Sequence, residues 1–303
     1  MLDQDLADIE VIVIDDGSSD DSVAIVKSMG NRDARIRIFI NPGSGIVDAL
    51  NTGISVARAP LSARMDSDDV SLPNRLSLQV EQFQADPDLQ LLGTAGLCID
   101  KAGRLLGHID VPCDDHEIRD AFSKHNPMLH PTVMFRTDAV RRAGGYRRAF
   151  TYAEDYDLWI RLSKLGRIAN MKAALVKLRT HPAQTSKIKR DQQKAAAALA
   201  RQSAALRHDR NEPFDENGQP ADAINAFLTW RAGDRRGIAS DECRDIELML
   251  RTPGLSSALT RKVLLRAAIG APSFSTLTLA PRLAWHRMEA RLAAFPTAKA
   301  GSL

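Results

Sequence analysis

The sequence has few cysteines and no long uninterrupted apolar segment. Its three cysteines, Cys98, Cys113 and Cys243, are far apart, and no two have the spacing of a metal-binding knuckle. An odd, sparse set of thiols is typical of a reducing compartment, and we interpret all three as inert. No segment reaches the roughly 18 apolar residues that a membrane-spanning helix needs. The acidic start also lacks the apolar core of a signal peptide, so we expect a cytoplasmic protein.

A large excess of charge of one sign is also missing. The 303 residues carry a formal net charge of only +3. Proteins that bind nucleic acid usually gather basic residues on one face, so this balance gives no electrostatic basis for a nucleic-acid partner. Hydrophobic residues make up 44% and charged residues 26% of the chain, as in ordinary globular proteins. The length fits one large domain, or a domain of about 150–200 residues with an extension.

Short runs of β-branched residues alternate with segments of helical periodicity. The apolar run at 11–14 is typical of a strand that is buried on both faces. The expected strands lie at 11–14, 36–40, 61–65, 91–99 and 130–136, and the expected helices lie at 22–29 and 46–57 and begin at Pro73 and Glu154. Ile46, Leu50 and Ile54 form the expected apolar stripe of the second helix. This alternation predicts an α/β fold with a mainly parallel sheet flanked by helices.

Two acidic clusters come directly after expected strands. Asp15 and Asp16 follow the first strand, and the segment 66–69 follows the third. In sheets of this kind, ligands bind beyond the carboxyl ends of the strands. Both clusters are therefore candidate site residues.

The segment 66–69, Asp-Ser-Asp-Asp, places three carboxylates within four residues. These charges repel one another unless a cation or a hydrogen-bond network compensates them. Carboxylate oxygens suit Mg²⁺ or Mn²⁺, which typically take one or two carboxylates together with substrate phosphates. On spacing alone, a solvated acidic turn before the next helix stays open as the alternative. A calcium-binding loop is excluded, because Val70 and Ser71 stand where it needs an oxygen ligand and a glycine.

Three other sets of polar residues are weaker indications of a functional site when each is considered alone. The carboxylates of Asp15 and Asp16 can accept hydrogen bonds from a nucleobase or a ribose, or belong to an ordinary turn. In the pair Glu154-Asp155, like charges raise one pKa toward the working pH, which suits a general base; a pair without a function is the alternative. His181 is either a metal ligand or a surface residue.

Several segments occur together in an order that is similar to one protein family. These segments are 13–20, 49–54, 63–69, 72–76, 130–136, 144–146 and 154–159. The first two resemble the nucleotide-contacting segment and the following helix of family 2 glycosyltransferases. The next two resemble the region of their DxD motif, and the last three resemble the acceptor-side half. The resemblance runs from about residue 1 to 188.

The resemblance implies a GT-A fold, an inverting mechanism and a nucleotide-sugar donor. By position, Asp15 and Asp16 would contact the base and the ribose. Asp66 and Asp68 would form the DxD pair, with Asp69 as an additional candidate. A divalent Mn²⁺ or Mg²⁺ ion would bridge Asp68 and the donor diphosphate and neutralise charge on the leaving nucleotide.

The resemblance also assigns the remaining candidates. Asp155 would take the proton from the acceptor hydroxyl as this attacks the anomeric carbon. His181 would assist the metal or the diphosphate, and Arg64 is a further candidate for the diphosphate. Glu154 is counted with the donor-binding residues.

The start of the chain departs from the family pattern. The family begins with a strand that ends in a Pro-x-Tyr-Asn-like segment, whereas residues 1–6 align with the end of the helix that follows this strand. The missing strand would lie in the middle of the sheet, so two strands would lack a neighbour and expose unpaired N–H and C=O groups. We therefore hypothesise that the true start lies upstream, or that the chain is a truncated product.

The composition changes near residue 187. Ala, Arg, Gln and Lys dominate up to about residue 210, which favours helix. We expect a GT-A-like domain at 1–190 and a helical C-terminal extension at 191–303. Within this extension, the segment 281–295 has apolar residues at helical spacing with three arginines among them. It is either a peripheral membrane contact at the inner face of the membrane or a helix packed on the catalytic domain.

The sequence as a whole predicts a metal-dependent glycosyltransferase. We expect it to move a sugar from a nucleotide-sugar donor to a hydroxyl of a glycan or lipid-linked acceptor, in surface polysaccharide or lipid-glycan biosynthesis. The alternative is a truncated, non-catalytic sugar-nucleotide-binding or scaffold protein. A nucleotidyltransferase is a third hypothesis, against which the Glu154-Asp155 pair argues.

Overall fold

The structure is a computed structural model that describes residues 1–41, 43, 45–181, 189, 193–194, 196–197 and 200–201. Its helices are α1 (Ser22–Gly30), α2 (Ile46–Val56), α3 (Arg75–Ala85), α4 (Asp115–Ala121), α5 (Thr137–Arg142) and α6 (Glu154–Leu162), with short 3-10 helices η1 (His130–Thr132) and η2 (Arg148–Phe150). Its strands are β1 (Val11–Asp15), β2 (Ile36–Ile40), β3 (Leu61–Ala63), β4 (Val70–Ser71), β5 (Leu89–Ile99), β6 (Leu105–Ile109), β7 (Met134–Arg136) and β8 (Arg167–Arg179). The segment 281–295 and most of the extension at 191–303 lie outside the described residues, so the division into domains stays a prediction.

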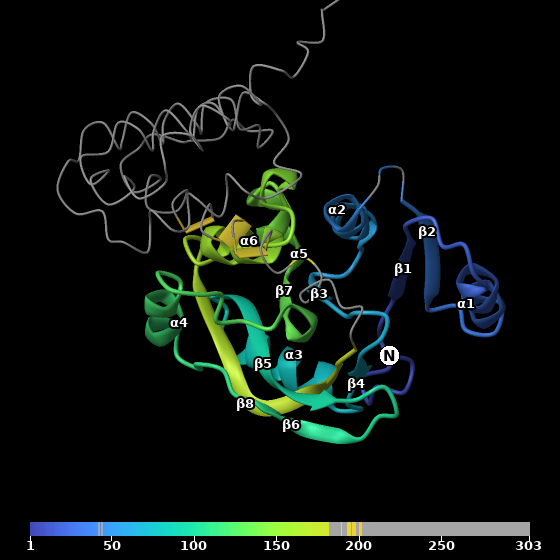
Figure 1. The fold of residues 1–303 in the computed structure, drawn as a ribbon, viewed down its shortest axis with the longest axis horizontal. Helices are drawn as coiled ribbons and strands as arrows, with labels where there is room; N and C mark the ends of the chain where they lie inside the picture. Colours follow the sequence, from blue (N-terminus) through green and yellow to red (C-terminus); the bar gives the residue numbers. More distant parts are fainter. Residues whose placement is uncertain are drawn as a thin grey trace, which may run out of the picture.

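The described strands form two sheets (Figure 1). β1 and β2 pair in parallel as a separate two-stranded sheet beside α1. The larger sheet has six strands in the order β3-β7-β5-β8-β4, and β6 pairs with the far end of β5. The long strands β5 and β8 run parallel to each other along most of their length and form the centre of this sheet.

The prediction of an α/β fold with flanking helices is confirmed, but the sheet is mixed rather than mainly parallel. Only the pairs β1–β2 and β5–β8 are parallel, whereas β3–β7, β5–β7, β4–β8 and β5–β6 are antiparallel. A parallel pair needs a long crossover connection, and a helix lies between β1 and β2. β5 and β6 are joined by a short turn at 100–104, which permits only antiparallel pairing.

The core lies on both faces of β5. Leu91 packs in a cluster with Ile118 of α4, Val140 of α5 and Trp159 of α6. On the opposite face, Leu92 belongs to the cluster that contains the apolar side chains of α3. β5 is therefore buried on both faces, as its apolar composition indicates. Within the described part of the chain, no helix is long and apolar enough to cross a lipid bilayer.

The two sheets each end in a strand with one unpaired edge. Among the described residues, β1 pairs only with β2, and β3 pairs only with β7. The side chains of β1 and β3 are only partly buried.

The predicted elements of the first 100 residues are confirmed, with one correction on α2. Val47 is buried and packs with Leu50 and Ile54 against the core, while Ile46 is 40% exposed. The stripe therefore follows i, i+3, i+7 rather than i, i+4, i+8. Part of the expected strand at 130–136 forms η1, and only its last three residues form β7.

Five elements were not predicted from the sequence, namely α4, α5, β4, β6 and β8. β8 is the largest of them, with 13 residues. Its sequence carries Lys172 and Lys177 among apolar residues, so neither an apolar run nor a strict alternation marks it as a strand. Its pairing with β5 determines its conformation.

Candidate active site

The carboxylates after β1 organise the loop that carries them. Asp15 Oδ1 accepts a hydrogen bond from the backbone N–H of Ser18 at 3.1 Å, and bonds from Ser18 hold the pKa of Asp15 below its usual range. Asp16 accepts from the side-chain amide of Asn41 at 2.6 Å and from the backbone N–H of Gly45 at 2.9 Å. Asp15 is therefore ionised at neutral pH, and Asp16 joins the ends of β1 and β2 to the start of α2.

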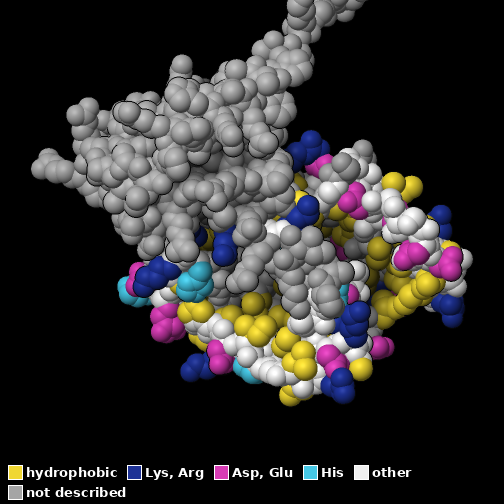
Figure 2. Space-filling model, in the orientation of Figure 1, with side chains coloured by type: hydrophobic (Ala, Val, Ile, Leu, Met, Phe, Trp, Pro, Cys, Tyr) yellow, Lys and Arg dark blue, Asp and Glu magenta, His cyan; other side chains and the backbone are white. Residues whose placement is uncertain are grey.

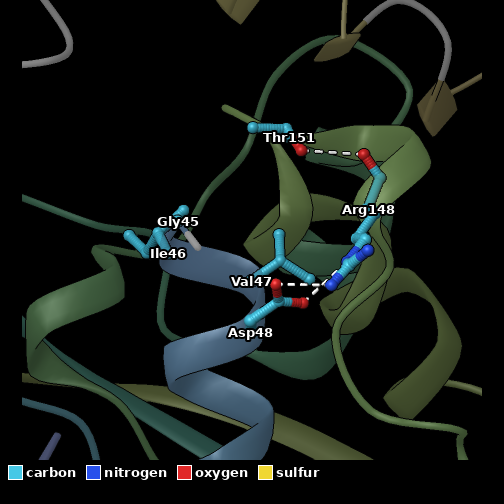
Figure 3. Close-up of a pocket in the computed structure, with 6 residues that line it drawn as sticks. All are labelled: Gly45, Ile46, Val47, Asp48, Arg148 and Thr151. Atoms are coloured by element: carbon cyan, nitrogen blue, oxygen red, sulfur yellow. Dashed lines mark hydrogen bonds and ion pairs between the residues drawn. The ribbon is translucent and has the colours of Figure 1, made fainter. Parts of the chain in front are cut away.

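A cavity of about 200 Å³ lies at the N-terminus of α2 (Figure 3). Gly45, whose N–H donates to Asp16, lines it from α2, and Arg148 and Thr151 line it from the segment before α6. Arg148 donates two hydrogen bonds to Asp48, at 2.7 and 2.5 Å. This bidentate ion pair connects the first turn of α2 to the segment that leads into Glu154 and Asp155.

The predicted acidic segment lies between β3 and β4. Arg64 Nη2 pairs with Asp66 Oδ1 at 2.5 Å, and Asp69 Oδ1 accepts the backbone N–H of Arg179 at 2.7 Å. Burial, with the charges of Asp66 and Asp68 added, raises the pKa of Asp69 to about 6. Repulsion among the carboxylates is thus only partly compensated by the protein.

His181 lies beside this acidic segment although it is 113 residues from Asp68 in the sequence. Its Nε2 is 3.2 Å from Asp68 Oδ2, and Arg179 Nε donates to the backbone oxygen of Asp68 at 2.8 Å. Among the described residues, however, no group of three or more His, Cys, Asp or Glu side chains is arranged to hold a metal ion. A divalent ion would need further ligands, such as phosphate oxygens of a substrate.

Arg64 is the cation that lies between the acidic groups. Its side chain is 11% exposed, and its charge acts to lower the pKa values of Asp69, Glu154 and Asp155. Its Nε and Nη1 are buried and have no hydrogen-bond partner among the described residues. A buried donor without a partner costs about 1–3 kcal/mol, and more when it is charged. These two nitrogens are therefore available to an anionic ligand.

Arg75 supports the loop that carries Arg64, and the sequence analysis did not assign it a role. Its fully buried guanidinium donates to the backbone oxygens of Arg64 at 2.8 Å and Val133 at 3.2 Å, and to Gln79 at 3.0 Å. Burial, with the charge of Arg64 added, lowers the pKa of Arg75 to about 9, so it remains charged at neutral pH. The sequence contained one sign that Arg75 and Gln79 lie near the buried face of α3, because each directly precedes an apolar residue of its stripe.

Glu154 and Asp155 begin α6, and both carboxylates are oriented by hydrogen bonds. Tyr152 has φ of +79°, a conformation that residues with a side chain rarely adopt, and its N–H donates to Glu154 Oε2 at 2.6 Å. Asp155 accepts from the side-chain amide of Asn126 at 2.8 Å and from the N–H of Tyr156 at 2.7 Å. Asn126 was not predicted, because it lies in a loop before η1 that has no motif of its own.

Burial raises the pKa values of both carboxyl groups. Glu154, with the charge of Asp155 added, has its pKa raised to about 7, and Asp155 has its pKa raised to about 6. Glu154 is 5% exposed, whereas Asp155 is partly exposed and lines a cavity of about 390 Å³. A carboxylate with a pKa near 6 is mostly ionised at pH 7 and can accept a proton, so Asp155 has the properties of a general base.

Most of the predicted site residues lie in one region of the molecule. The acidic segment 66–69 contacts His181 and Arg64, and Arg64 acts electrostatically on Glu154 and Asp155. Asp15 and Asp16 form a separate group, because no hydrogen bond or ion pair joins them to the other predicted residues in the part of the chain that the structure describes.

Comparisons with known proteins identify the family to which this sequence is similar. The model of glycosyl transferase family 2 matches residues 1–148. The chain is similar to the amylovoran biosynthesis glycosyltransferase AmsE of Erwinia amylovora, with 32% identity over 56% of this chain and 64% of AmsE. It is also similar to the O-antigen biosynthesis glycosyltransferase WbnJ of Escherichia coli, with 32% identity over 62% of this chain and 74% of WbnJ. The chain thus spans less than two thirds of the length of AmsE.

The fold is similar to that of a solved protein of lower sequence identity. The crystal structure of TarS from S. aureus aligns with a TM-score of 0.50 and 16% identity, over 88% of this chain and 49% of TarS. At this identity, the likeness concerns the fold alone. The similarity to WbnJ and the family match show that the chain belongs to glycosyltransferase family 2.

Proposed function

We propose that this protein is an inverting glycosyltransferase that moves a sugar from a nucleotide-sugar donor to a hydroxyl group of a glycan or lipid-linked acceptor. The observation that carries this proposal is the position of Asp155. Its carboxylate lines a cavity, has a pKa raised to about 6, and lies near the same cation, Arg64, that pairs with Asp66. A candidate base and an acidic segment that both interact with Arg64 fit a reaction between two bound substrates.

The donor would bind through charged and hydrogen-bonding groups that the fold already positions. The carboxylates of Asp15 and Asp16 can accept hydrogen bonds from the nucleobase and the ribose. The two buried nitrogens of Arg64 that lack partners would donate to the diphosphate, because guanidinium groups bind phosphate strongly.

The acidic segment offers ligands that suit a divalent ion, Mn²⁺ or Mg²⁺. The bound substrate would supply the remaining ligands. Asp68 and His181 offer an oxygen and a nitrogen ligand 3.2 Å apart, and Asp66 and Asp69 lie in the same segment. These ligand types suit such ions, but the protein groups alone are too few for a closed site. When bound with the donor, the ion would supply Lewis-acid stabilisation of the leaving diphosphate.

The proposed transfer step centres on Asp155. The acceptor hydroxyl gives its proton to the Asp155 carboxylate as the oxygen attacks the anomeric carbon. The bond from this carbon to the diphosphate oxygen breaks, and the nucleoside diphosphate leaves with the electron pair. Hydrogen bonds from Asn126 and Tyr156 hold the carboxylate in place during this step. Direct attack by the acceptor inverts the configuration of the anomeric carbon.

We further propose that the product belongs to a surface polysaccharide or an O-antigen-type glycan. This proposal is supported by the names of AmsE and WbnJ, which place those two proteins in amylovoran and O-antigen biosynthesis. Neither of these names describes a non-catalytic sugar-nucleotide-binding protein. This alternative predicts a different result in the donor experiment that follows.

The test is a panel of nucleotide sugars with Mn²⁺, first in a thermal-shift assay and then in an assay for release of the nucleoside diphosphate. We expect one donor to raise Tm and to be turned over, with turnover lost in Asp155→Asn. A donor that binds but is never turned over, with any acceptor fraction, would support the non-catalytic alternative. If no donor binds, the proposed function is wrong.

A further inference from the structure

The side chain of Asn51, in the middle of α2, binds both backbone groups of one distant residue. Its Oδ1 accepts the N–H of Tyr146 at 2.8 Å, and its Nδ2 donates to the carbonyl oxygen of Tyr146 at 2.8 Å. A Cβ on Gly145 would lie 2.5 Å from Asn51 Oδ1, so the glycine leaves room for this close approach. The Asn51 side chain therefore satisfies both backbone groups, as a neighbouring strand would, and fixes the segment before α6 against α2.

Tyr146 connects this contact to the part of the fold that carries Arg64. Its hydroxyl and His130 Nε2 are 3.1 Å apart and share a hydrogen bond. His130 begins η1, and the carbonyl oxygen of Val133, the residue after η1, accepts the backbone N–H of Arg64 at 2.9 Å. Burial lowers the pKa of His130 well below its usual range and raises the pKa of Tyr146, so both groups are neutral at neutral pH. The connection from Asn51 to the backbone of Arg64 therefore consists of hydrogen bonds between neutral groups.

The other end of α2 is joined to the loop that carries Asp16. The N–H of Gly45, the residue before α2, donates to the Asp16 carboxylate at 2.9 Å. Because α2 is an 11-residue hydrogen-bonded helix, it holds its first turn and Asn51 at a fixed spacing. Asp16 and Arg64 are thus connected through α2, Asn51 and Tyr146.

Two arginines also join α2 to the same segment, but from the surface. Arg141 donates to carbonyl oxygens at the C-terminal end of α2, and Arg148 pairs with Asp48 while 73% of the Arg148 side chain is exposed. Solvent weakens charged contacts of this kind. Tyr146, in contrast, is only 3% exposed, so of these three contacts the one made by Asn51 is the contact to a buried residue.

We propose that Asn51 is a positioning residue, which sets the distance between the carboxylates that recognise the nucleoside and Arg64, so that one donor reaches both. This inference rests on the proposed function and adds to it the residue that relates the two ends of the donor site. A nucleoside diphosphate that contacts Asp15 and Asp16 through its nucleoside and Arg64 through its diphosphate is held at two points. The second contact strengthens binding only when the two points keep the spacing of the ligand. A nucleoside without phosphates contacts one point alone, so its affinity does not depend on that spacing.

The test compares one-point and two-point ligands on the full chain. Uridine, cytidine, adenosine, guanosine and thymidine and their 5′-diphosphates are titrated with Mg²⁺ by ligand-observed NMR, which also measures the weak binding of a nucleoside. In Asn51→Ala, we expect Kd of the diphosphate that binds to rise about tenfold or more, while Kd of its nucleoside changes by less than about twofold. Asn31→Ala, at an exposed asparagine that follows α1, is the matched control and should change neither.

Gly145→Ala disturbs the same contact from the opposite side and decides the question if Asn51→Ala does not fold. Its Cβ would displace Asn51 Oδ1, whereas the Cβ of Gly144→Ala meets no atom within 4 Å. We expect Gly145→Ala to bind the nucleoside diphosphate about threefold or more weakly than Gly144→Ala, with nearly equal binding of the nucleoside.

The two kinds of ligand separate this inference from the proposed function. Suppose that a nucleoside diphosphate binds the wild type, but that the variants weaken it no more than their controls do, or weaken its nucleoside to the same extent. The positioning role is then contradicted and the transferase proposal is untouched. The same conclusion holds if the nucleoside does not bind the wild type measurably, because the nucleoside end is then not a separate point of contact. If no nucleoside diphosphate binds the wild type, the proposed function itself fails.

Discussion

The two-stranded sheet and the larger sheet hold their functional groups in different ways. No residue of β1, α1 or β2 is fully buried, and Ile40 at the end of β2 is 78% exposed. Figure 2 shows hydrophobic side chains on the surface at this end of the molecule. β5, in contrast, is buried along most of its length, and α6 packs its apolar residues into the main core.

This difference in burial gives carboxylates of the same kind opposite properties. Asp15 is solvated and accepts hydrogen bonds, so its pKa is lowered and it stays ionised as a hydrogen-bond acceptor. Asp155 begins α6, and burial raises its pKa to about 6, close to the value that suits a base at neutral pH. We propose from this comparison that the exposed part recognises a ligand and the buried part carries out the proton transfer. The predictions that follow can contradict or refine this division.

The largest expected effect is on the buried side. Asp155→Asn keeps the shape of the side chain but removes the base, so we expect kcat for transfer to fall about 10²–10⁴-fold. Asp138→Asn, an aspartate of α5 with 74% of its side chain exposed, is the matched control and should retain wild-type kcat. Initial rates at saturating donor measure both. An Asp155→Asn enzyme with more than a tenth of wild-type kcat would rule out Asp155 as the base.

Replacement of Arg64 should act on both parts of the site. Arg64→Gln removes the buried donors that lack partners, so we expect Kd for the donor to rise about 10–100-fold, as for the loss of one or two charged hydrogen bonds. The pKa of Asp155 should also rise, because the charge of Arg64 lowers it in the wild type. Calorimetric titration measures the first effect and the pH–rate profile the second. Arg104→Gln, with 81% of its side chain exposed, should change neither.

A contact between α2 and the segment before α6 should be sensitive to a single methyl group. Gly145 has φ of +68°, and a Cβ there would lie 2.5 Å from Asn51 Oδ1, which accepts the N–H of Tyr146 at 2.8 Å. Gly144 has φ of +79°, but a Cβ there meets no atom within 4 Å. Both Gly→Ala variants carry the cost of a positive φ, so we expect Gly145→Ala to be about 1–3 kcal/mol less stable than Gly144→Ala. Urea denaturation of the two variants gives this difference, and equal stabilities would contradict the observed packing.

The smallest expected effect is on the pH dependence of stability. The pKa of Glu154 is raised to about 7 in the folded state, above the usual value of 4.5, so the folded state binds this proton more tightly than the unfolded state. Its contribution to stability is therefore full below about pH 4.5 and is lost as the pH rises toward 7. Between pH 4.5 and pH 8, the wild type should lose about 1–3 kcal/mol of its free energy of unfolding that Glu154→Gln does not lose. Exposed Glu117→Gln should show no such change, and a Glu154→Gln variant with the wild-type pH slope would contradict the raised pKa.

The sequence predicted the elements whose patterns are local. The apolar run before Asp15 marked β1, and the run at 36–40 marked β2 with its observed bounds. The order of the acidic segments, through the family resemblance, indicated Asp66 to Asp69 and Asp155 as site residues. The structure places His181 next to Asp68, and its role toward a metal or the diphosphate stays a prediction.

The remaining features depend on contacts between distant residues, which a local pattern cannot contain. β8 becomes a strand because it pairs with β5, although its own residues do not alternate. The buried Arg75 is stabilised by backbone oxygens of Arg64 and Val133, which lie 11 and 58 residues away. The raised pKa of Asp155 arises from burial by several elements of the fold.

The most direct test of the division between the two parts measures donor Kd and kcat in two variants of the same chemical kind. Asp15→Asn changes the carboxylate at the end of β1, and Asp155→Asn changes the carboxylate at the start of α6. We predict that Asp15→Asn raises donor Kd about tenfold with kcat at saturation nearly unchanged, as for the loss of one charged hydrogen bond. Asp155→Asn should leave donor Kd unchanged and lower kcat at least 100-fold. If both variants raise Kd alone, or both lower kcat alone, the two parts do not divide recognition and proton transfer between them.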